Sequence, residues 1–396
     1  MLSTSELLPS NPFIMWAVGF SATSCFFLGS LLAYACYHAF YYRPLPDYRS
    51  KGMKVGITKL RELPAEYVPL GLLVARGIIQ FLVVSIFKFI VGVRNTVEVV
   101  KDENYSYLMQ QMRSRQEGVS LLTASNHASS LDDPGLLSCL IPMDVAMSPK
   151  RMRWSLATQE IAFPNIPLVQ AFMGAGQVLP IWRGGGIDQP LFFDVCRQIA
   201  AGRWIHLFPE ARVVQSGILG IDPVTKRSEA ELKEKGLLKW GIGKLIAHLP
   251  KRPVFVPFYH VGMTAVLPQH NRWEKGTYNN LVISWDPRHY GRGNKVKVWV
   301  GESCSFDDLI EEHEKKHGPL WKIPTEAPQE KWEETMKQWK SREVDKPLYH
   351  HITRRVEKCL KNLEARSLAD LDKHPDPLVQ KFCQRCVAAM PKKHSD

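Results

Sequence analysis

The stretch LLTASNHASSLDDPGLLSCL, Leu121 to Leu140, joins a short apolar run to a second apolar segment of helical length through a turn of small residues. The run VSLLTAS has the composition of a buried strand. His127 lies in the turn among small neighbours that leave it accessible, and Asp132 and Asp133 follow it closely. This strand-to-helix corner is either an ordinary helix cap or part of an enzyme active site.

Local sequence rules predict that a helix begins at this corner. Ser130 is the expected N-cap, Asp133 its capping-box partner, and Pro134 falls in the first turn, where its missing N–H matters little. Asp132 would lie at the positive end of the helix dipole. Taken alone, a capped helix with a solvent-facing histidine is the simpler interpretation. A metal site made of His127, Asp132 and Asp133 is a further alternative.

The same residues also suit proton transfer. A carboxylate beside an imidazole fixes the ring tautomer and makes the other ring nitrogen a better base. Such a pair can take the proton from a hydroxyl nucleophile. His127 with Asp132 is therefore a candidate catalytic pair, and the rest of the sequence has to decide between this hypothesis and the helix cap.

Length and pattern indicate one large α/β domain with appended segments. The chain has 396 residues, of which 45% are hydrophobic and 10% aromatic, which excludes global disorder. Apolar runs alternate with helix-length segments such as Leu191–Ala201 and Ala230–His248. The runs cover residues 119–125, 176–182, 203–209, 253–261, 280–285 and 295–301. This alternation predicts a mixed β-sheet flanked by helices.

The domain is expected to span residues 96–320, with a polar insertion at about 215–228. A charged, helical C-terminal tail follows over residues 321–396. The only C-x-x-C pair, Cys383 and Cys386, has no second pair to complete a zinc site, so we interpret it as incidental.

The N-terminus has the composition of a membrane segment. No Asp, Glu, Lys or Arg occurs between Leu7 and Tyr42, a run longer than the roughly 20 residues that cross a bilayer core. Residues 1–42 are therefore predicted to be a membrane-embedded segment, whereas a cleaved leader would have a basic start and a shorter apolar core. Residues 43–95 are predicted to be a basic linker followed by an amphipathic membrane-interface segment.

The second apolar stretch, Tyr67 to Val93, is interrupted by Arg76 and Lys88. A helix in the headgroup plane, with its basic residues near lipid phosphates, is expected, and a core helix of the domain is the alternative. The net charge of +12 also favours an anionic partner. Nucleic acid is not expected, because no aromatic–basic stripe or known module accompanies the charge.

Three further motifs stand at the ends of apolar runs. In GAGQVLPIWRGGG, Arg183 precedes three glycines and could clamp a phosphate, or belong to a plain surface loop. In WIHLFPEAR, Glu210 could accept a bond from a substrate hydroxyl while Arg212 binds its phosphate, or the two could form a surface ion pair. In PVFVPFYHVGM, Pro257 and His260 could line an acyl chain or belong to the core.

The order of these motifs resembles the four motifs of the glycerophospholipid acyltransferases over roughly residues 96–305. The matching features are His127-x4-Asp132, Arg183 after an apolar strand, Phe208-Pro209-Glu210, and the apolar strand with Pro257. Within the family the sequence is most similar to the members that exchange acyl chains between phospholipids. The stretches on which this similarity rests are NHASSLDDP, FPEARV, LKWGIGKLI and PFYHVGMTAVLP. Ala211 stands where most of the family has glycine.

The resemblance implies an O-acyltransferase with His127 and Asp132 as catalytic residues and Arg183, Glu210 and Arg212 as substrate-binding residues. It implies a phospholipid–lysophospholipid transacylase that remodels cardiolipin and uses donors such as phosphatidylcholine. It further implies a place in a mitochondrial membrane, inner or outer, facing the intermembrane space. Neither coenzyme A nor a metal is expected as a cofactor. A homo-oligomer is compatible with the sequence.

Two alternatives remain open on the sequence. An acyltransferase that uses acyl-coenzyme A to acylate a lysophospholipid or lysophosphatidic acid would share every motif residue. An inactive membrane scaffold on the same fold would be expected to have lost His127, Asp132 or Glu210, and all three are present.

Overall fold

The computed structural model describes residue 30, residue 68 and residues 70–163, 167–214, 236–267 and 291–373. The predicted membrane segment 1–42, apart from Ser30, lies outside these ranges. The polar insertion, the strand expected at 280–285 and the end of the tail beyond residue 373 also lie outside them.

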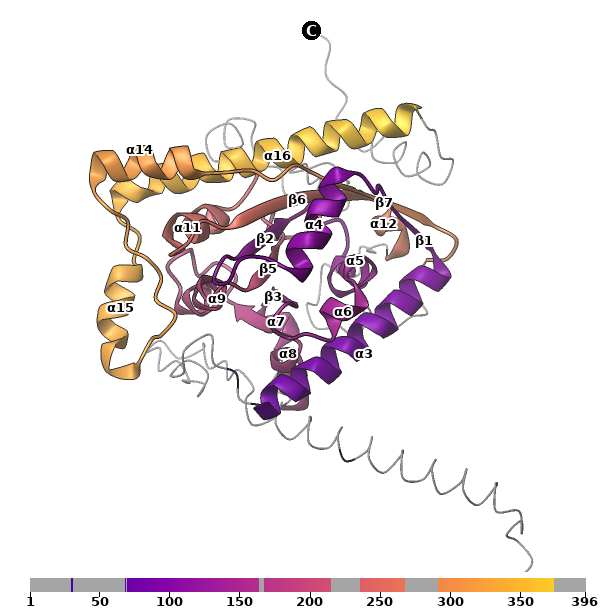
Figure 1. The fold of residues 1–396 in the computed structure, drawn as a ribbon, viewed down its shortest axis with the longest axis horizontal. Helices are drawn as coiled ribbons and strands as arrows, with labels where there is room; N and C mark the ends of the chain where they lie inside the picture. The colour runs from indigo at the N-terminus through magenta and orange to yellow at the C-terminus, as the bar shows by residue number, and fades with distance from the viewer. Residues whose placement is uncertain are drawn as a thin grey trace, which may run out of the picture.

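The described residues form a seven-stranded mixed sheet in the order β1-β7-β6-β2-β5-β3-β4 (Figure 1). The strands are β1 Thr96–Val99, β2 Leu121–Ala124, β3 Arg153–Thr158, β4 Val178–Ile181, β5 Trp204–Leu207, β6 Val254–Val261 and β7 Lys295–Val300. The pair β6–β7 is antiparallel and every other neighbouring pair is parallel. The predicted fold class is confirmed.

The parallel arrangement decides where functional groups meet. Because β2, β3, β4, β5 and β6 run in one direction, the loops that follow them emerge at the same edge of the sheet. In the register, Ala124 at the end of β2 is level with Leu207 of β5 and Pro257 of β6. Residues that follow these positions are therefore brought together, as is usual for sites at the carboxyl ends of parallel strands.

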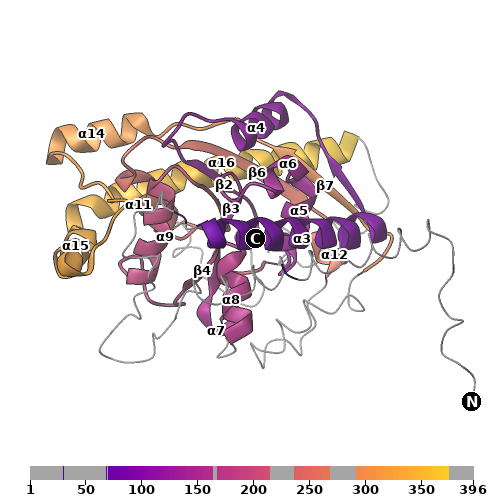
Figure 2. The ribbon, with the colours of Figure 1, turned by 60° about the horizontal axis from the view of Figure 1, so that its bottom comes forward.

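Helices cover both faces of the sheet. The longer helices are α3 Leu70–Arg94, α4 Glu103–Arg113, α8 Pro167–Ala175, α9 Pro190–Ala200, α11 Gly241–His248, α14 Asp307–His317, α15 Trp332–Trp339 and α16 Lys346–Lys373. The short ones are the π-helical turn η1 Asp132–Leu136, α5 Leu137–Leu140, α6 Met143–Ala146, α7 Gln159–Ala162, α12 Met263–Val266, and the 3₁₀ turns η4 Gln329–Lys331 and η5 Glu343–Asp345. Figures 1 and 2 show α16 and α3 on opposite sides of the domain.

The core consists of two apolar layers, one on each face of the sheet. Consecutive strand residues alternate between them: Leu122 and Ile205 pack with α9, α11 and α16, whereas Leu121 and Trp204 pack with α3, α4 and α5. Strands buried on both faces are expected to be apolar throughout, which explains why short apolar runs in the sequence marked most of them.

Pro257 lies where β6 changes partner. Residues 254–257 of β6 pair with β2, and residues 258–261 pair with β7. A proline has no N–H to give to a ladder, so the point between two pairings suits it. The strand is buried, and the core interpretation of the motif PVFVPFYHVGM applies in place of an acyl-chain wall.

Helix α3 lies along the domain with one face buried and the other exposed. It contacts η1, α5, α6 and α8. Its outer face carries an exposed apolar stripe of Leu82, Ile86, Phe89 and Val93, spaced for one side of a helix. Among the described helices, α3 alone is long and apolar enough to cross a membrane, although 44% of its most apolar window is buried.

The prediction that Arg76 and Lys88 face lipid phosphates is wrong. Arg76 is 3% exposed, and its guanidinium carbon lies 4.8 Å from the centre of the Trp154 ring. Lys88 Nζ donates to the backbone carbonyl of Ile141 at 3.1 Å. The helix packs on the domain, so both cations find an aromatic face or a carbonyl there.

Candidate active site

The turn after β2 brings His127 and Asp132 into contact. Asp132 Oδ2 lies 3.0 Å from His127 Nδ1 and accepts hydrogen bonds from the backbone N–H groups of Ala128 at 2.7 Å and Ser129 at 2.9 Å. Because a carboxylate that already accepts two N–H groups acts as an acceptor, His127 Nδ1 carries the proton and Nε2 keeps its lone pair. The pair therefore has the arrangement of a base and the group that orients it.

The local burial of the pair is unequal. The side chain of His127 is 17% exposed, whereas that of Asp132 is 1% exposed. Asp132 is thus held inside the protein, while the imidazole can still meet a substrate. This is the burial pattern that a general base and its supporting carboxylate require.

The expected helix cap is not formed. The turn η1 begins after Leu131, which makes no side-chain capping bond, so the prediction of Ser130 as N-cap with Asp133 as capping-box partner is wrong. The carboxylate of Asp133 instead pairs with Arg153 and accepts the hydroxyl of Ser155, both on β3. A buried cation on β3, which is separated from β2 by β5, attracts this carboxylate more strongly than a helix terminus would.

The direction of its side chain also separates Asp133 from His127 and Asp132. The side chains of the two adjacent aspartates point in different directions: Asp132 points toward His127, and Asp133 points toward β3. Among the residues that the structure describes, no group of His, Cys, Asp or Glu side chains is arranged to hold a metal ion.

The segment after β5 wraps around the backbone of His127. The N–H of His127 donates to Glu210 Oε1 at 2.9 Å, and the N–H of Val214 donates to the carbonyl of His127 at 2.6 Å. The ring of Phe208 stacks on the imidazole at 4.0 Å between centroids. Glu210 and Arg212 are therefore brought beside His127. Glu210 holds the turn that carries His127, and its predicted contact with substrate stays a prediction.

Ala211 adopts the left-handed backbone conformation, with φ of 57°. Its N–H donates to the carbonyl of Phe208 at 2.9 Å and closes the turn that presents Glu210. A residue with a Cβ is disfavoured in this region, whereas glycine enters it freely. The geometry therefore explains why a glycine would suit this position of the motif.

A buried polar layer supports the turn from below. His206 on β5 contacts the hydroxyls of Thr123 at 3.0 Å and Ser125 at 3.3 Å, and its ring stacks on Phe258. Burial is the main cause that lowers the pKa of His206 well below its usual value, followed by the charge of Arg153. The ring is therefore neutral at pH 7 and acts through hydrogen bonds.

Arg183 lies farther away. It follows β4, the edge strand, and two strands separate β4 from β2, which corresponds to about 14 Å across the sheet. Its side chain is exposed. The turn that carries it is shaped by Gln189, whose amide accepts from the N–H of Trp182 at 2.8 Å and donates to the carbonyls of Trp182 and Gly186. The structure does not bring Arg183 into contact with His127.

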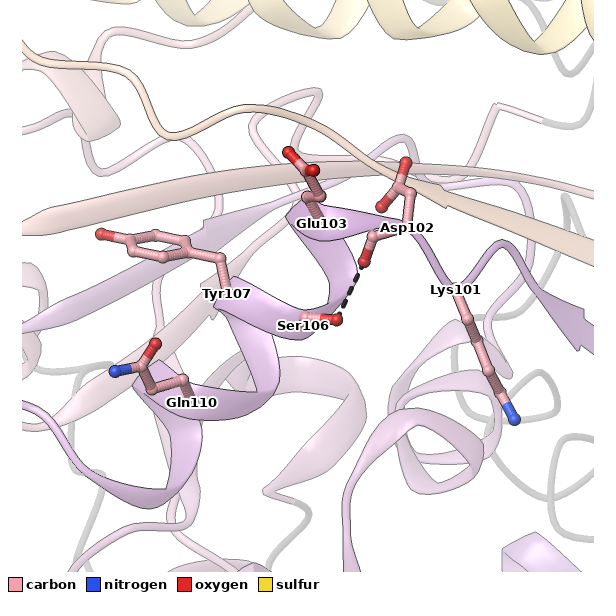
Figure 3. A pocket seen from close by; sticks show the side chains of 6 residues that line it. All are labelled: Lys101, Asp102, Glu103, Ser106, Tyr107 and Gln110. Atoms are coloured by element: carbon pink, nitrogen blue, oxygen red, sulfur yellow. Dashed lines mark hydrogen bonds between the residues drawn. The ribbon is translucent and has the colours of Figure 1, made fainter.

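The hollow in Figure 3 is a separate feature. It lies at the start of α4, where Asp102 caps the helix by accepting from the N–H of Tyr105, and its backbone carbonyl accepts the hydroxyl of Ser106. None of the candidate site residues lines it. Its two acids serve the helix start, so we assign it no role in the site.

Some site residues carried no clear signal in the sequence. Phe208 belongs to the Phe-Pro-Glu motif but gives no hint that it stacks on the imidazole. Asn126 precedes the histidine and pairs with His260, 134 positions later in the chain. Val214 contributes only its backbone. The position of Asn126 next to the base was the one local signal available.

A histidine–carboxylate pair at the carboxyl edge of a mixed α/β sheet, followed by the remaining motifs in order, defines an acyltransferase-type protein. The acyltransferase family model matches residues 100–261, which hold the candidate pair His127 and Asp132, Arg183 and the Phe-Pro-Glu motif. This match and the geometry agree on the class.

Individual relatives narrow the class. The chain is 32% identical to tafazzin of Drosophila melanogaster over 216 residues, 54% of this chain and 48% of that protein. It is 32% identical to an N-acylphosphatidylethanolamine synthase of Arabidopsis thaliana over 231 residues, 57% of this chain and 70% of that protein. It is 26% identical to tafazzin of Saccharomyces cerevisiae over 235 residues, 52% of this chain and 56% of that protein.

The chain belongs to this acyltransferase family and is a tafazzin-like member of it. The predicted resemblance is confirmed at that level. The match spans about half of the length of the fruit-fly tafazzin.

Proposed function

We propose that the protein is a transacylase that moves a fatty acyl chain from a phospholipid to the free hydroxyl of a lysophospholipid, with cardiolipin among its products. The observation that carries the proposal is the contact of 3.0 Å between His127 Nδ1 and Asp132 Oδ2, which leaves Nε2 as the base. Neither coenzyme A nor a metal takes part in the proposed reaction.

In the proposed reaction, His127 Nε2 removes the proton from the acceptor hydroxyl as its oxygen attacks the ester carbonyl of the donor. The tetrahedral intermediate then collapses, the ester bond of the donor breaks, and the departing oxygen takes the proton back from Nε2. Asp132 holds the imidazole and stabilises its positive charge in between. The products are a new phospholipid and the lysophospholipid derived from the donor.

Phosphate recognition is assigned to the two arginines of the motifs. Arg212 follows Glu210 by two positions in the segment bonded to His127, which supports a contact with the acceptor next to the reacting hydroxyl. Arg183, exposed in the loop after the edge strand β4, is suited to a phosphate farther from the reacting centre. A planar guanidinium binds phosphate through two parallel N–H groups. Binding at these points would align the hydroxyl with the base.

Both substrates reside in a bilayer, and the exposed stripe of α3 supports membrane contact. Phe89 and Val93 are each 67% exposed, on a helix whose opposite face is buried in the domain. We propose that this stripe rests in the headgroup region of a mitochondrial membrane and complements the N-terminal segment. The test uses protein without residues 1–42, with Ile86 and Phe89 changed to glutamate, and measures flotation with cardiolipin-rich liposomes. Val344→Glu is the control at an exposed apolar residue elsewhere, and equal flotation of all variants would contradict the assignment.

A second candidate acceptor, an amine, is suggested by the match to the Arabidopsis protein, which covers most of that protein. The Arabidopsis protein, aligned over 70% of its length, is called an N-acylphosphatidylethanolamine synthase. The same base could take a proton from an amine that attacks the ester. The acceptor is therefore a hydroxyl or, in this second candidate, the amine of phosphatidylethanolamine.

The deciding experiment is an acyl-transfer assay with purified protein in liposomes. These contain phosphatidylcholine labelled in its acyl chain, monolysocardiolipin and phosphatidylethanolamine, with and without acyl-coenzyme A. We expect label in cardiolipin and an equal yield of lysophosphatidylcholine without coenzyme A, and neither product with His127→Ala. Label only in an N-acylated lipid would select the second candidate. Formation of unlabelled cardiolipin only when acyl-coenzyme A is added would contradict the transacylase and favour the coenzyme-dependent reaction.

A further inference from the structure

His260 lies in β6, beneath the turn that carries His127. Its side chain is 1% exposed and points to the same face of the sheet as Phe258. The neighbouring Tyr259 points to the opposite face, where its hydroxyl donates to Glu364 Oε1 at 3.1 Å. Two adjacent residues of one strand thus make separate buried polar contacts, and only that of His260 faces the site.

Asn126 and His260 are joined by three hydrogen bonds. Asn126 Oδ1 accepts from the backbone N–H of His260 at 3.0 Å, and Asn126 Nδ2 donates to its backbone carbonyl at 2.9 Å. The ring Nε2 of His260 donates to the carbonyl of Asn126 at 3.1 Å. A carbonyl can only accept, so Nε2 carries the proton. Burial lowers the pKa of His260, which keeps the ring neutral at pH 7.

The peptide bond between Asn126 and His127 is therefore fixed at both ends. Its carbonyl accepts from His260 Nε2 and from Ser125 Oγ at 2.9 Å, and its N–H donates to Glu210 Oε1. The plane of this peptide sets the direction in which the His127 side chain leaves the backbone. Loss of the bond from His260 would leave one end of the plane with a single donor.

The surroundings of His260 contain few ionisable groups. Asp132 Oδ2 lies 3.6 Å from Nε2, beyond hydrogen-bond distance but close enough for the N–H dipole to favour the carboxylate charge. His127 on the turn and His206 on β5 are the other titratable side chains that interact with it. From β7, Val298 stands opposite His260.

We propose that His260 is a positioning residue for acyl transfer: by holding the Asn126 carbonyl, it keeps the imidazole of His127 aligned with Asp132 and with the acceptor hydroxyl. The inference rests on the proposed function, because it requires His127 to act as the base. It adds a fixed, neutral hydrogen-bond donor on β6 to the groups that determine the turnover rate.

The test compares His260→Leu with His260→Gln in the full-length protein, with labelled phosphatidylcholine as donor and a lysophospholipid as acceptor. His260→Leu removes the ring donor, and we expect kcat to fall by about 10- to 100-fold while KM for the acceptor changes by less than about twofold. His260→Gln keeps an N–H that can reach the same carbonyl, so it should recover most of kcat. Tyr259→Phe is the matched control: it should lower the thermal midpoint and leave kcat unchanged.

The results separate failure of the positioning role of His260 from failure of the proposed acyl-transfer function. Wild-type kcat in His260→Leu would overturn the positioning role, and so would a fall in kcat of the same size in Tyr259→Phe. If His260→Leu does not fold, His260→Met, with a more adaptable apolar side chain, removes the same ring donor from the Asn126 carbonyl. Its kcat should fall by a similar factor, and a normal kcat would overturn the proposal. Absence of acyl transfer in the wild-type protein would instead contradict the proposed function.

Discussion

The turn after β2 and the loop after β4 lie at the same edge of the sheet, yet they are built differently. The turn holds His127 by bonds from β6, η1 and the segment after β5, and its carboxylate is buried. The loop exposes Trp182 to 47% and leaves Arg183 on the surface, with Gln189 as the side chain that shapes it. This contrast supports the two proposed roles, because a group that transfers a proton needs a fixed geometry, whereas a group that binds a lipid headgroup has to meet a large ligand from outside.

Substitution of His127, the proposed base, should have the largest effect on acyl transfer. We expect His127→Ala to lower acyl transfer by about 10²- to 10⁴-fold, the usual contribution of general-base catalysis. Folding should be kept, because a partly exposed ring in a turn adds little to the core. The measurement is initial rate in liposomes together with the thermal midpoint. His351→Ala, at an exposed histidine on α16, is the control, and near-normal transfer by His127→Ala would remove this histidine from the mechanism.

The two adjacent aspartates of the turn should respond differently to substitution, one through kcat and the other through stability. Asp132→Asn should lower kcat by about 10²-fold or more, because an amide can donate to Nδ1 and so favour the wrong tautomer. Asp133→Asn should instead reduce the free energy of unfolding by about 3 kcal/mol, because it leaves the buried Arg153 without its ionised partner. Urea titration and kcat of both variants are compared. Equal loss of kcat at both positions with unchanged stability would contradict this division of roles.

Substitution of Arg183, in the loop after β4, should weaken substrate binding and leave the chemical step nearly unchanged. Arg183→Lys is expected to raise KM for the acceptor or donor lipid by about tenfold with little change in kcat, because lysine lacks the planar fork. Arg113→Lys, at an exposed arginine on α4 paired with Asp144, is the matched control and should change neither constant. A loss confined to kcat would place Arg183 in the chemical step and remove the contrast between the two loops.

The smallest expected effect concerns the turn beside His127. Ala211→Gly should raise the free energy of unfolding by about 0.5–1 kcal/mol, because relief of the left-handed backbone exceeds the added entropy of the unfolded chain. Ala365→Gly, at an exposed position in α16, should lower it by about 1 kcal/mol. Denaturant titration measures both, and destabilisation by Ala211→Gly would show that the side chain of Ala211 makes a stabilising contact.

The two strands that were not predicted show where sequence patterns fail. β1 has the sequence TVEV and is only partly buried, with Glu98 paired to Lys295. β3 contains Arg153 and Ser155, whose polar side chains are buried because Asp133 meets them from the turn. Hydrophobic patterning detects apolar runs, so a four-residue strand that contains a charged residue and a strand whose polar side chains pair with a turn both escape it.

The mixed α/β class, most of the buried strands, the long C-terminal helix and the pairing of His127 with Asp132 could all be predicted from the amino-acid sequence, because these features depend on local pattern and short spacing. The tertiary structure was needed to show that Asp133 turns away toward Arg153 on β3, that Arg76 is buried, and that Glu210 and His260 both bind the peptide between Asn126 and His127. Those contacts join segments 83 and 134 positions apart. Their partners are selected by strand order and by the cost of leaving a buried polar group unpaired, neither of which is written in any local stretch.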